Sequence, residues 1–208
     1  MTTIETVEIE PKSDNEIRLA IYDYQVRINM FDIPRYEFQL PDQHIRQIYV
    51  HIELPQIISN HYSYIWNPNL GLHIIKSILC SDTNESLYDT NMQISSYCSC
   101  EQSKLRGFDQ MLCCNKTHNE MLELSKTGYS MYIPLENSIK SNKTIMLELL
   151  PLHLLYSHND INDNIDIMKL IKANIKVSLC VDVIIESHNH EINSISEQKF
   201  KKFKQDQS

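Results

Sequence analysis

The sequence predicts an all-β domain, a sandwich of two antiparallel sheets with one or two short helices in long connections. Two segments carry this prediction, Gln47–Leu54 and Ile175–Ile185, in which apolar residues alternate with mostly polar ones. Successive side chains of a strand point to opposite faces, so this alternation indicates a strand with one buried face. Pro55 directly follows the first segment, and proline cannot donate to a strand ladder.

Weaker period-two patterns predict further strands, and polar clusters such as Ser81–Asn84 separate most of them. The first segment, Ile4–Ile9, fits either an extended arm or an edge strand. About seven or eight strands in a chain of this size are typical of a sandwich, of either jelly-roll or immunoglobulin-like connectivity. The other predicted strands are Gln25–Met30, Leu72–Cys80, Tyr129–Leu135 and Thr144–Leu150.

Two stretches depart from the β pattern. The second half of Phe108–Lys126 has apolar residues near helical spacing and is followed by Gly128, so we expect a helix that ends there. Asp160–Ala173 has a similar spacing, and Asn162–Asn164 offers residues that favour a helix start.

The chain has 208 residues, which suits one domain with tails. We assign residues 1–16 to an N-terminal arm, 17–187 to the sandwich and 188–208 to a polar C-terminal tail.

Charge and composition exclude several classes of function. The net charge is −8 and no basic stripe is present, which disfavours direct nucleic acid binding. The clustered cations lie in the tail and are Lys199, Lys201, Lys202 and Lys204. They are either solvated or in contact with a polyanion or an acidic partner. No apolar run approaches the ~20 residues that a membrane-spanning helix needs. The N-terminus lacks a secretory signal pattern, so we expect reduced cysteines and a cytosol-like compartment.

Four segments, taken in order, are similar to the major capsid proteins of nucleocytoplasmic large DNA viruses. Ile45–Pro55 is similar to a strand of that family that ends in an acidic-Leu-Pro triplet. Tyr64–Asn67 and then Gly71–Ile78 resemble an aromatic segment followed by a Gly-x-x-Ile-Ile-Lys-x-Val strand. Gly107–Met111 resembles a Gly-Tyr-Asp-x-Met segment, and Tyr132–Leu135 resembles a Tyr-Ile-Pro-Leu-Pro strand.

The resemblance implies a jelly roll, similar to the first of the two jelly rolls in that family. Because this chain has room for only one jelly roll, the resemblance implies a penton, minor or divergent major capsid subunit or a scaffold component. Such a protein is not an enzyme and needs no cofactor. It would self-associate as a trimer or pentamer, bind other capsid proteins, and be found in the virion and in the host cytoplasm during assembly. The hairpin at Ser81–Glu85 departs from the glycine-rich hairpin of the family.

Cysteines and a histidine form one candidate metal site. Cys98 and Cys100 are followed by the Cys113–Cys114 pair and His118, and zinc binds thiolates and imidazoles tetrahedrally. The candidate ligands are Cys98, Cys100, Cys114 and His118. The spacing is not that of a zinc ribbon, and buried thiols in a reducing compartment are the alternative interpretation.

A second metal hypothesis is a cupin-like enzyme, based on His188-Asn189-His190-Glu191. The pair lies in the predicted tail without flanking glycines, where a solvated segment is the simpler interpretation. With three glycines in the chain, neither a nucleophile elbow nor a phosphate loop motif occurs.

Aromatic residues offer a candidate interface. Tyr62, Tyr64 and Trp66 lie close together in the sequence, and such residues often anchor subunit contacts. Packing in the core is the equally weighted alternative. A β-sandwich that binds a protein or glycan through its loops is the alternative function.

Overall fold

In the computed structural model, the described residues are 4–13, 16–23, 33–58, 64–80, 86, 88, 107, 109–135, 143–158, 167–171 and 173–184. They are mostly strands in antiparallel sheets, so the all-β prediction is confirmed. The larger sheet has the order β1-β2-β10-β4-β7, with bounds Ile4–Ser13, Glu16–Asp23, Lys176–Ile184, His44–Leu54 and Tyr129–Leu135.

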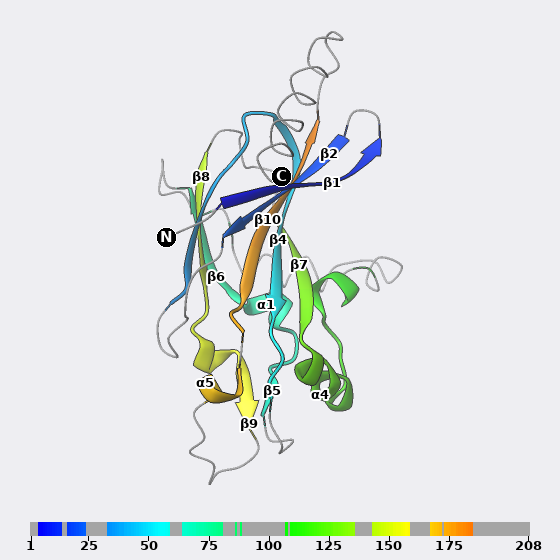
Figure 1. The fold of residues 1–208 in the computed structure, drawn as a ribbon, viewed down its shortest axis with the longest axis vertical. Helices are drawn as coiled ribbons and strands as arrows, with labels where there is room; N and C mark the ends of the chain where they lie inside the picture. The colour runs from blue at the N-terminus through cyan, green and yellow to red at the C-terminus, as the bar shows by residue number, and fades with distance from the viewer. Residues whose placement is uncertain are drawn as a thin grey trace, which may run out of the picture.

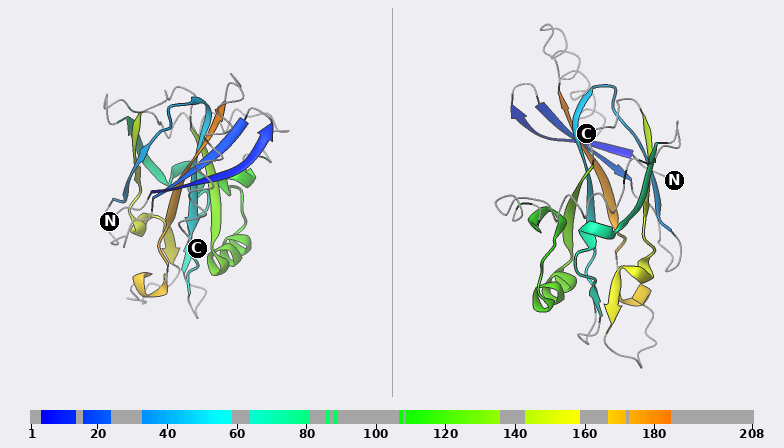
Figure 2. Two further views of the ribbon diagram at one scale, coloured as in Figure 1. Left: turned by 45° about the horizontal axis from the view of Figure 1, so that its top comes forward. Right: turned by 180° about the vertical axis from the view of Figure 1, so that it is seen from behind.

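A smaller sheet faces the larger one (Figure 1). Its order is β3-β8-β6, with bounds Arg35–Gln39, Thr144–Leu149 and Ile75–Cys80. A separate two-stranded ribbon pairs β5 (Tyr64–Trp66) with β9 (Tyr156–His158). The helical elements are α1 (Leu70–His73), α4 (His118–Thr127), η1 (Leu152–Leu154) and α5 (Ile167–Leu170). Figure 2 shows α4, α5 and the ribbon at the same end of the molecule.

Alternation along the strands builds the core between the sheets. In β4, Ile48, Val50 and Ile52 are at most 2% exposed, and they pair in register with Val181, Leu179 and Val177 of β10. The smaller sheet contributes buried residues of the same kind, among them Tyr36, Phe38, Ile78, Ile145, Leu147 and Leu149. The two apolar faces therefore close on each other and exclude water.

Four strand predictions agree with the structure closely. Gln47–Leu54 lies within β4, Ile175–Ile185 contains β10, Tyr129–Leu135 is β7, and Thr144–Leu150 contains β8. One prediction needs correction, because Leu72–Cys80 is a strand only from Ile75. The residues before it form α1, in which Gly71 packs directly against the backbone of Leu112.

Other segments were not predicted or lie outside the described residues. The structure adds β2, β3, β5 and β9, and it places Ile4–Ser13 as β1, an edge strand of the larger sheet. The predicted strand Gln25–Met30 and the tail 188–208 lie outside the described residues. Of the predicted helix Asp160–Ala173, the described part contains α5.

The helix predicted before Gly128 is confirmed as α4. Thr117 caps it, because the Thr117 hydroxyl accepts from the Glu120 backbone N–H and the Glu120 carboxylate accepts from the Thr117 backbone N–H. Gly128 follows the last turn with φ 77°, a backbone conformation that favours glycine. A Cβ at Gly128 would lie 2.8 Å from the carbonyl oxygen of Leu54.

We expect Gly71→Ala to lower the free energy of unfolding by about 1–3 kcal/mol, because the new Cβ would lie 2.2 Å from the backbone oxygen of Leu112. Gly107→Ala is the matched control, since a Cβ there meets nothing within 4 Å. Urea unfolding followed by circular dichroism measures both variants. Equal midpoints for Gly71→Ala and Gly107→Ala would contradict the close packing of α1.

Candidate functional site

One end of the sandwich, which we call the helical end, contains residues 55–58, 64–73, 109–128 and 150–171 where described. Backbone hydrogen bonds join these separate connections to one another. Ile57 N–H donates to Ser125 O at 2.7 Å, Ile58 N–H to Leu170 O at 2.8 Å, and Asn67 N–H to Leu155 O at 2.9 Å. Three long connections are thus held together as one surface on a rigid support.

Trp66 is the centre of this arrangement and is fully buried, at 0% exposure. Its indole N–H donates to Pro55 O at 2.9 Å, and its backbone N–H donates to the Ser125 hydroxyl oxygen at 2.9 Å. Tyr64 is also buried, with its ring centroid 6.1 Å from that of Tyr156. The interface prediction for Tyr64 and Trp66 is therefore corrected, because both side chains pack inside the chain. Tyr62 lies outside the described residues.

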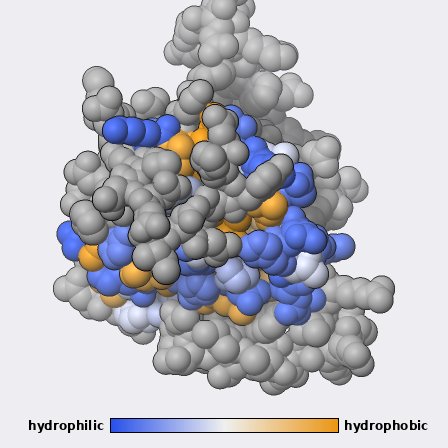
Figure 3. Space-filling view, turned by 90° about the horizontal axis from the view of Figure 1, so that it is seen from below, coloured by the Kyte–Doolittle hydropathy of each residue, from blue (hydrophilic) through white to orange (hydrophobic). Residues whose placement is uncertain are grey.

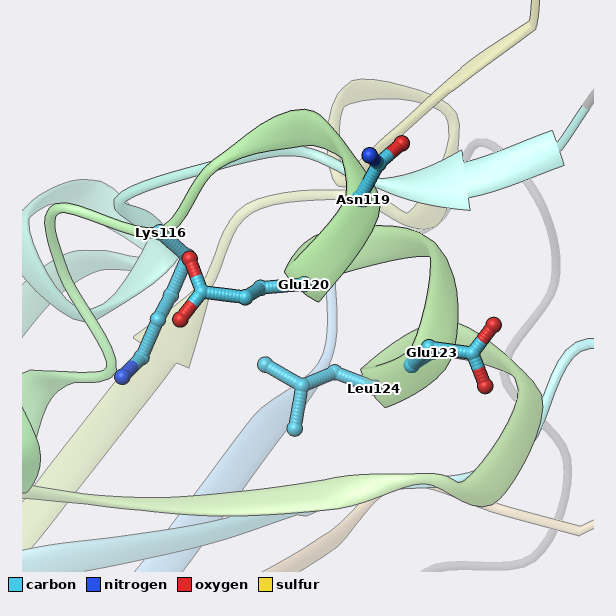
Figure 4. Close-up of a pocket in the computed structure, with 5 residues that line it drawn as sticks. All are labelled: Lys116, Asn119, Glu120, Glu123 and Leu124. Carbon is cyan, nitrogen blue, oxygen red and sulfur yellow. The ribbon is translucent and has the colours of Figure 1, made fainter.

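A shallow groove of about 420 Å³ runs beside α4 on this end, lined by Lys116, Asn119, Glu120, Glu123 and Leu124 (Figure 4). The side chains of Lys116, Glu120 and Leu124 lie on the same side of the helix. The groove thus combines an apolar side chain with two carboxylates, one amide and one ammonium group.

Both carboxylates of the groove already have one partner. Glu120 Oε2 accepts from the backbone N–H and hydroxyl of Thr117 at 2.8 and 2.7 Å, and these hydrogen bonds lower the pKa of Glu120. Glu123 Oε1 pairs with Lys126 Nζ at 2.7 Å. Among the described residues, the second oxygen of each carboxylate accepts no hydrogen bond, so each can still accept one from a ligand.

The cysteine site is partly described. Cys98 and Cys100 lie outside the described residues, whereas Cys114 is 1% exposed and His118 is exposed at the start of α4. The Cys114 thiol donates to Leu112 O at 3.6 Å. Burial, with Asp109 and Cys113 nearby, raises the pKa of Cys114 to about 12, which disfavours the thiolate that zinc requires.

Within the described part of the chain, no three His, Cys, Asp or Glu side chains gather as a metal site would require. The zinc hypothesis stays a prediction, because half of its ligands are not described. The His188–His190 pair likewise lies outside the described residues.

The outer face of the larger sheet carries an aromatic pair that the sequence analysis did not single out. The rings of His51 and Tyr132 stack with centroids 4.3 Å apart and an interplanar angle of 10°. Burial lowers the pKa of His51, the Glu53 carboxylate opposes this shift, and the Lys176 ammonium adds to it. Glu53 and Lys176 pair with each other at 3.1 Å. The stack thus favours a neutral imidazole.

We expect the free energy of unfolding to decrease as the pH falls below 6.5, because the unfolded chain then binds a proton at His51 that the folded chain resists. His51→Phe keeps a stacked ring and cannot titrate, so this part of the pH dependence should disappear. His44→Gln is the control, since His44 is exposed. Urea midpoints at pH 8, 7, 6 and 5 test the difference, and parallel curves for wild type and His51→Phe would contradict it.

The smaller sheet carries a buried carboxylate on its outer face. Glu148 is 8% exposed, and it is held by Arg35 Nε at 2.8 Å, Lys76 Nζ at 3.3 Å and the Ser77 hydroxyl at 3.0 Å. Burial alone would raise the pKa of Glu148, but the hydrogen bonds from Ser77 and Lys76 and the charges of Lys76 and Arg35 outweigh it and lower the pKa. The cluster ties all three strands together.

We expect Glu148→Gln to lower the free energy of unfolding by about 1–2 kcal/mol at neutral pH, because charge-assisted hydrogen bonds are lost. The stabilisation by Glu148 is present above its unfolded pKa of 4.5 and is lost as the pH falls through the lower folded pKa. The difference between wild type and variant should therefore shrink below pH 4.5. Glu37→Gln, at an exposed position of β3, is the matched control and should leave stability nearly unchanged.

The surface of the helical end is mostly hydrophilic, with separate apolar patches among the described residues (Figure 3). Among these residues the exposed large apolar side chains are Ile33, Tyr132 and Leu154, with exposed fractions of 36%, 38% and 47%. Leu154 belongs to η1 at the helical end. Ile33 lies next to Pro34, and the Pro34 carbonyl accepts a hydrogen bond from the Leu149 backbone N–H. Apolar side chains that are exposed singly, as these are, are normal on a protein surface.

None of the helices in the described residues is long and apolar enough to cross a membrane. The sequence was also compared with protein-family models and with curated proteins, and it matched none of them.

Proposed function

We propose that this protein is a single jelly-roll subunit of a viral shell or its scaffold, and that it works by self-association. The observation that carries the proposal is the nested pairing of strands. A jelly roll is a long antiparallel hairpin of eight strands rolled into two sheets, so its first strand pairs with the eighth, the second with the seventh and the third with the sixth. With β2 taken as the first strand, the pairs β2·β10, β3·β8 and β4·β7 follow this rule.

The distribution of these pairs between the sheets supports the same proposal. In a rolled hairpin, alternate pairs share a sheet, which gives β2-β10-β4-β7 on one side and β3-β8-β6 on the other. In this numbering β6 is the fourth strand, and a jelly roll pairs the fourth strand with the fifth, which follows it in the chain. An antiparallel bridge between Leu79 and Ser86 lies at this place. An immunoglobulin-like sandwich would order the strands differently.

The segments that resemble the capsid family fall on corresponding elements. Ile45–Pro55 contains most of β4, Tyr64–Asn67 contains β5, Gly71–Ile78 spans most of α1 and the start of β6, and Tyr132–Leu135 ends β7. The resemblance thus follows the hairpin through its third, fourth and sixth strands. It supports a capsid role, with the virion and the host cytoplasm during assembly as the places of action.

Self-association is the property that tests the proposal. A shell subunit with a rigid two-sheet body meets copies of itself in closed symmetry. We expect purified protein to reach three or five times the monomer mass of 24.4 kDa as its concentration rises, and then to hold that mass over a further tenfold increase. Light scattering coupled to size exclusion measures the mass, and negative-stain electron microscopy shows whether rings form. A constant 24.4 kDa at millimolar concentration would refute the proposal.

The groove beside α4 favours a second candidate function, that of a β-sandwich binding module for a protein partner. The two functions differ in one measurable way. A binding module stays monomeric and captures a foreign peptide in the groove, whereas a shell subunit associates with copies of itself. The mass measurement above separates them.

A further inference from the structure

The tail of this chain has the opposite charge to the rest of it. Four lysines and two phenylalanines make up residues 199–204, which therefore carry a charge of +4. Since the whole chain carries −8, the other residues sum to −12 (−8 − 4). This Lys-Phe segment, as we call residues 199–204, is attracted to acidic surfaces of the same protein, and its phenyl rings favour an apolar contact.

The groove beside α4 has the complementary net charge, −1 from Glu120, Glu123 and Lys116 (−2 + 1). Leu124 offers an apolar contact, and Glu120 and Glu123 each have a second carboxylate oxygen that accepts no hydrogen bond among the described residues. In Figure 4 Glu120 and Leu124 lie on one side of the helix, and Glu123 points away from Glu120 at the next turn. A lysine pairing with such an oxygen makes a charge-assisted hydrogen bond.

The point where the tail begins suggests which copy the Lys-Phe segment reaches. β10 ends at Ile184, at the opposite end of the sandwich from α4 (Figure 1). The 14 residues 185–198 can span roughly 45–50 Å when extended. A neighbour stacked end to end would present its helical end near that point.

Resting on the proposed self-association, we propose that the Lys-Phe segment of one copy binds in the α4 groove of a second copy. This contact joins two different surfaces, so it links successive subunits in one direction and closes into a ring when the rotation permits. The occupant of the groove is therefore another copy of this chain, held by lysines on Glu120 and Glu123 and by a phenyl ring on Leu124.

Charge-reversed variants of the full chain test this contact. The groove variant is Glu120→Gln with Glu123→Lys, since glutamine still completes the capping box with Thr117. The tail variant changes Lys199, Lys201, Lys202 and Lys204 to Glu. We expect each variant alone to need at least fivefold higher concentration than wild type to reach the same mass, because several charge pairs are lost. Adding 0.5 M NaCl to wild type should have a similar effect.

Mixing the variants gives the decisive result. The groove variant retains a basic tail and the tail variant retains an acidic groove, so an equimolar mixture should form a 1:1 dimer that neither forms alone. Glu37→Lys is the control, because it makes the same substitution as Glu123→Lys, a charge change of +2, at an exposed residue of β3. It should associate like wild type. Circular dichroism melting of each variant confirms that the chain is folded.

The outcomes separate this inference from the proposed function. If wild type associates and both variants associate equally well, the tail contact is wrong and self-association stands. If wild type is monomeric at every concentration, self-association itself fails. If the mixture stays monomeric, the contact between copies is refuted. If a spin label on the tail reports contact with α4 at a dilution where only monomer is present, the groove holds the tail of its own chain, which also refutes the contact between copies.

Discussion

The pairing of β4 with β10 is the constraint on which the rest of the structure depends. Both strands are interior to the larger sheet, and their register aligns Ile52 with Val177, Val50 with Leu179 and Ile48 with Val181. A slip of one residue would turn all of these side chains to the outer face, where Lys176 and Glu53 now pair. These two strands position the smaller sheet that packs on them. They also position the helical end, because Pro55, directly after β4, accepts a hydrogen bond from the Trp66 indole.

The sequence predicted the elements whose periodicity is strong, and it missed those that depend on tertiary contacts. The strands β4, β7 and β10 follow from alternation, and α4 follows from apolar residues near helical spacing with Gly128 after them. β3 has two buried apolar residues in five, too few to stand out, and α1 forms where Gly71 meets Leu112, forty-one positions later in the chain. The Glu148 cluster joins residues from three strands, which periodicity cannot reveal. The α4 groove is lined by the single stretch Lys116–Leu124, and its shape depends on how α4 packs in the fold. The sequence left core packing and interface contact as equal alternatives for Trp66. In the structure Trp66 is buried in the core and forms hydrogen bonds with Ser125 and Pro55.

The proposed function uses the two ends of the sandwich differently. The helical end is fixed by hydrogen bonds between connections, so its groove and its exposed Leu154 keep their positions relative to the sheets. The end of β10, in contrast, leads into a long polar segment. The proposed contact would give each copy a direction, so that copies would be arranged in order and not merely clustered.

Both edge strands of the larger sheet contain a proline, Pro11 in β1 and Pro134 in β7. A proline has no amide hydrogen to offer, and its ring hinders a further strand from docking alongside. Each edge strand of the larger sheet therefore contains one residue that cannot donate a backbone hydrogen bond to an added strand.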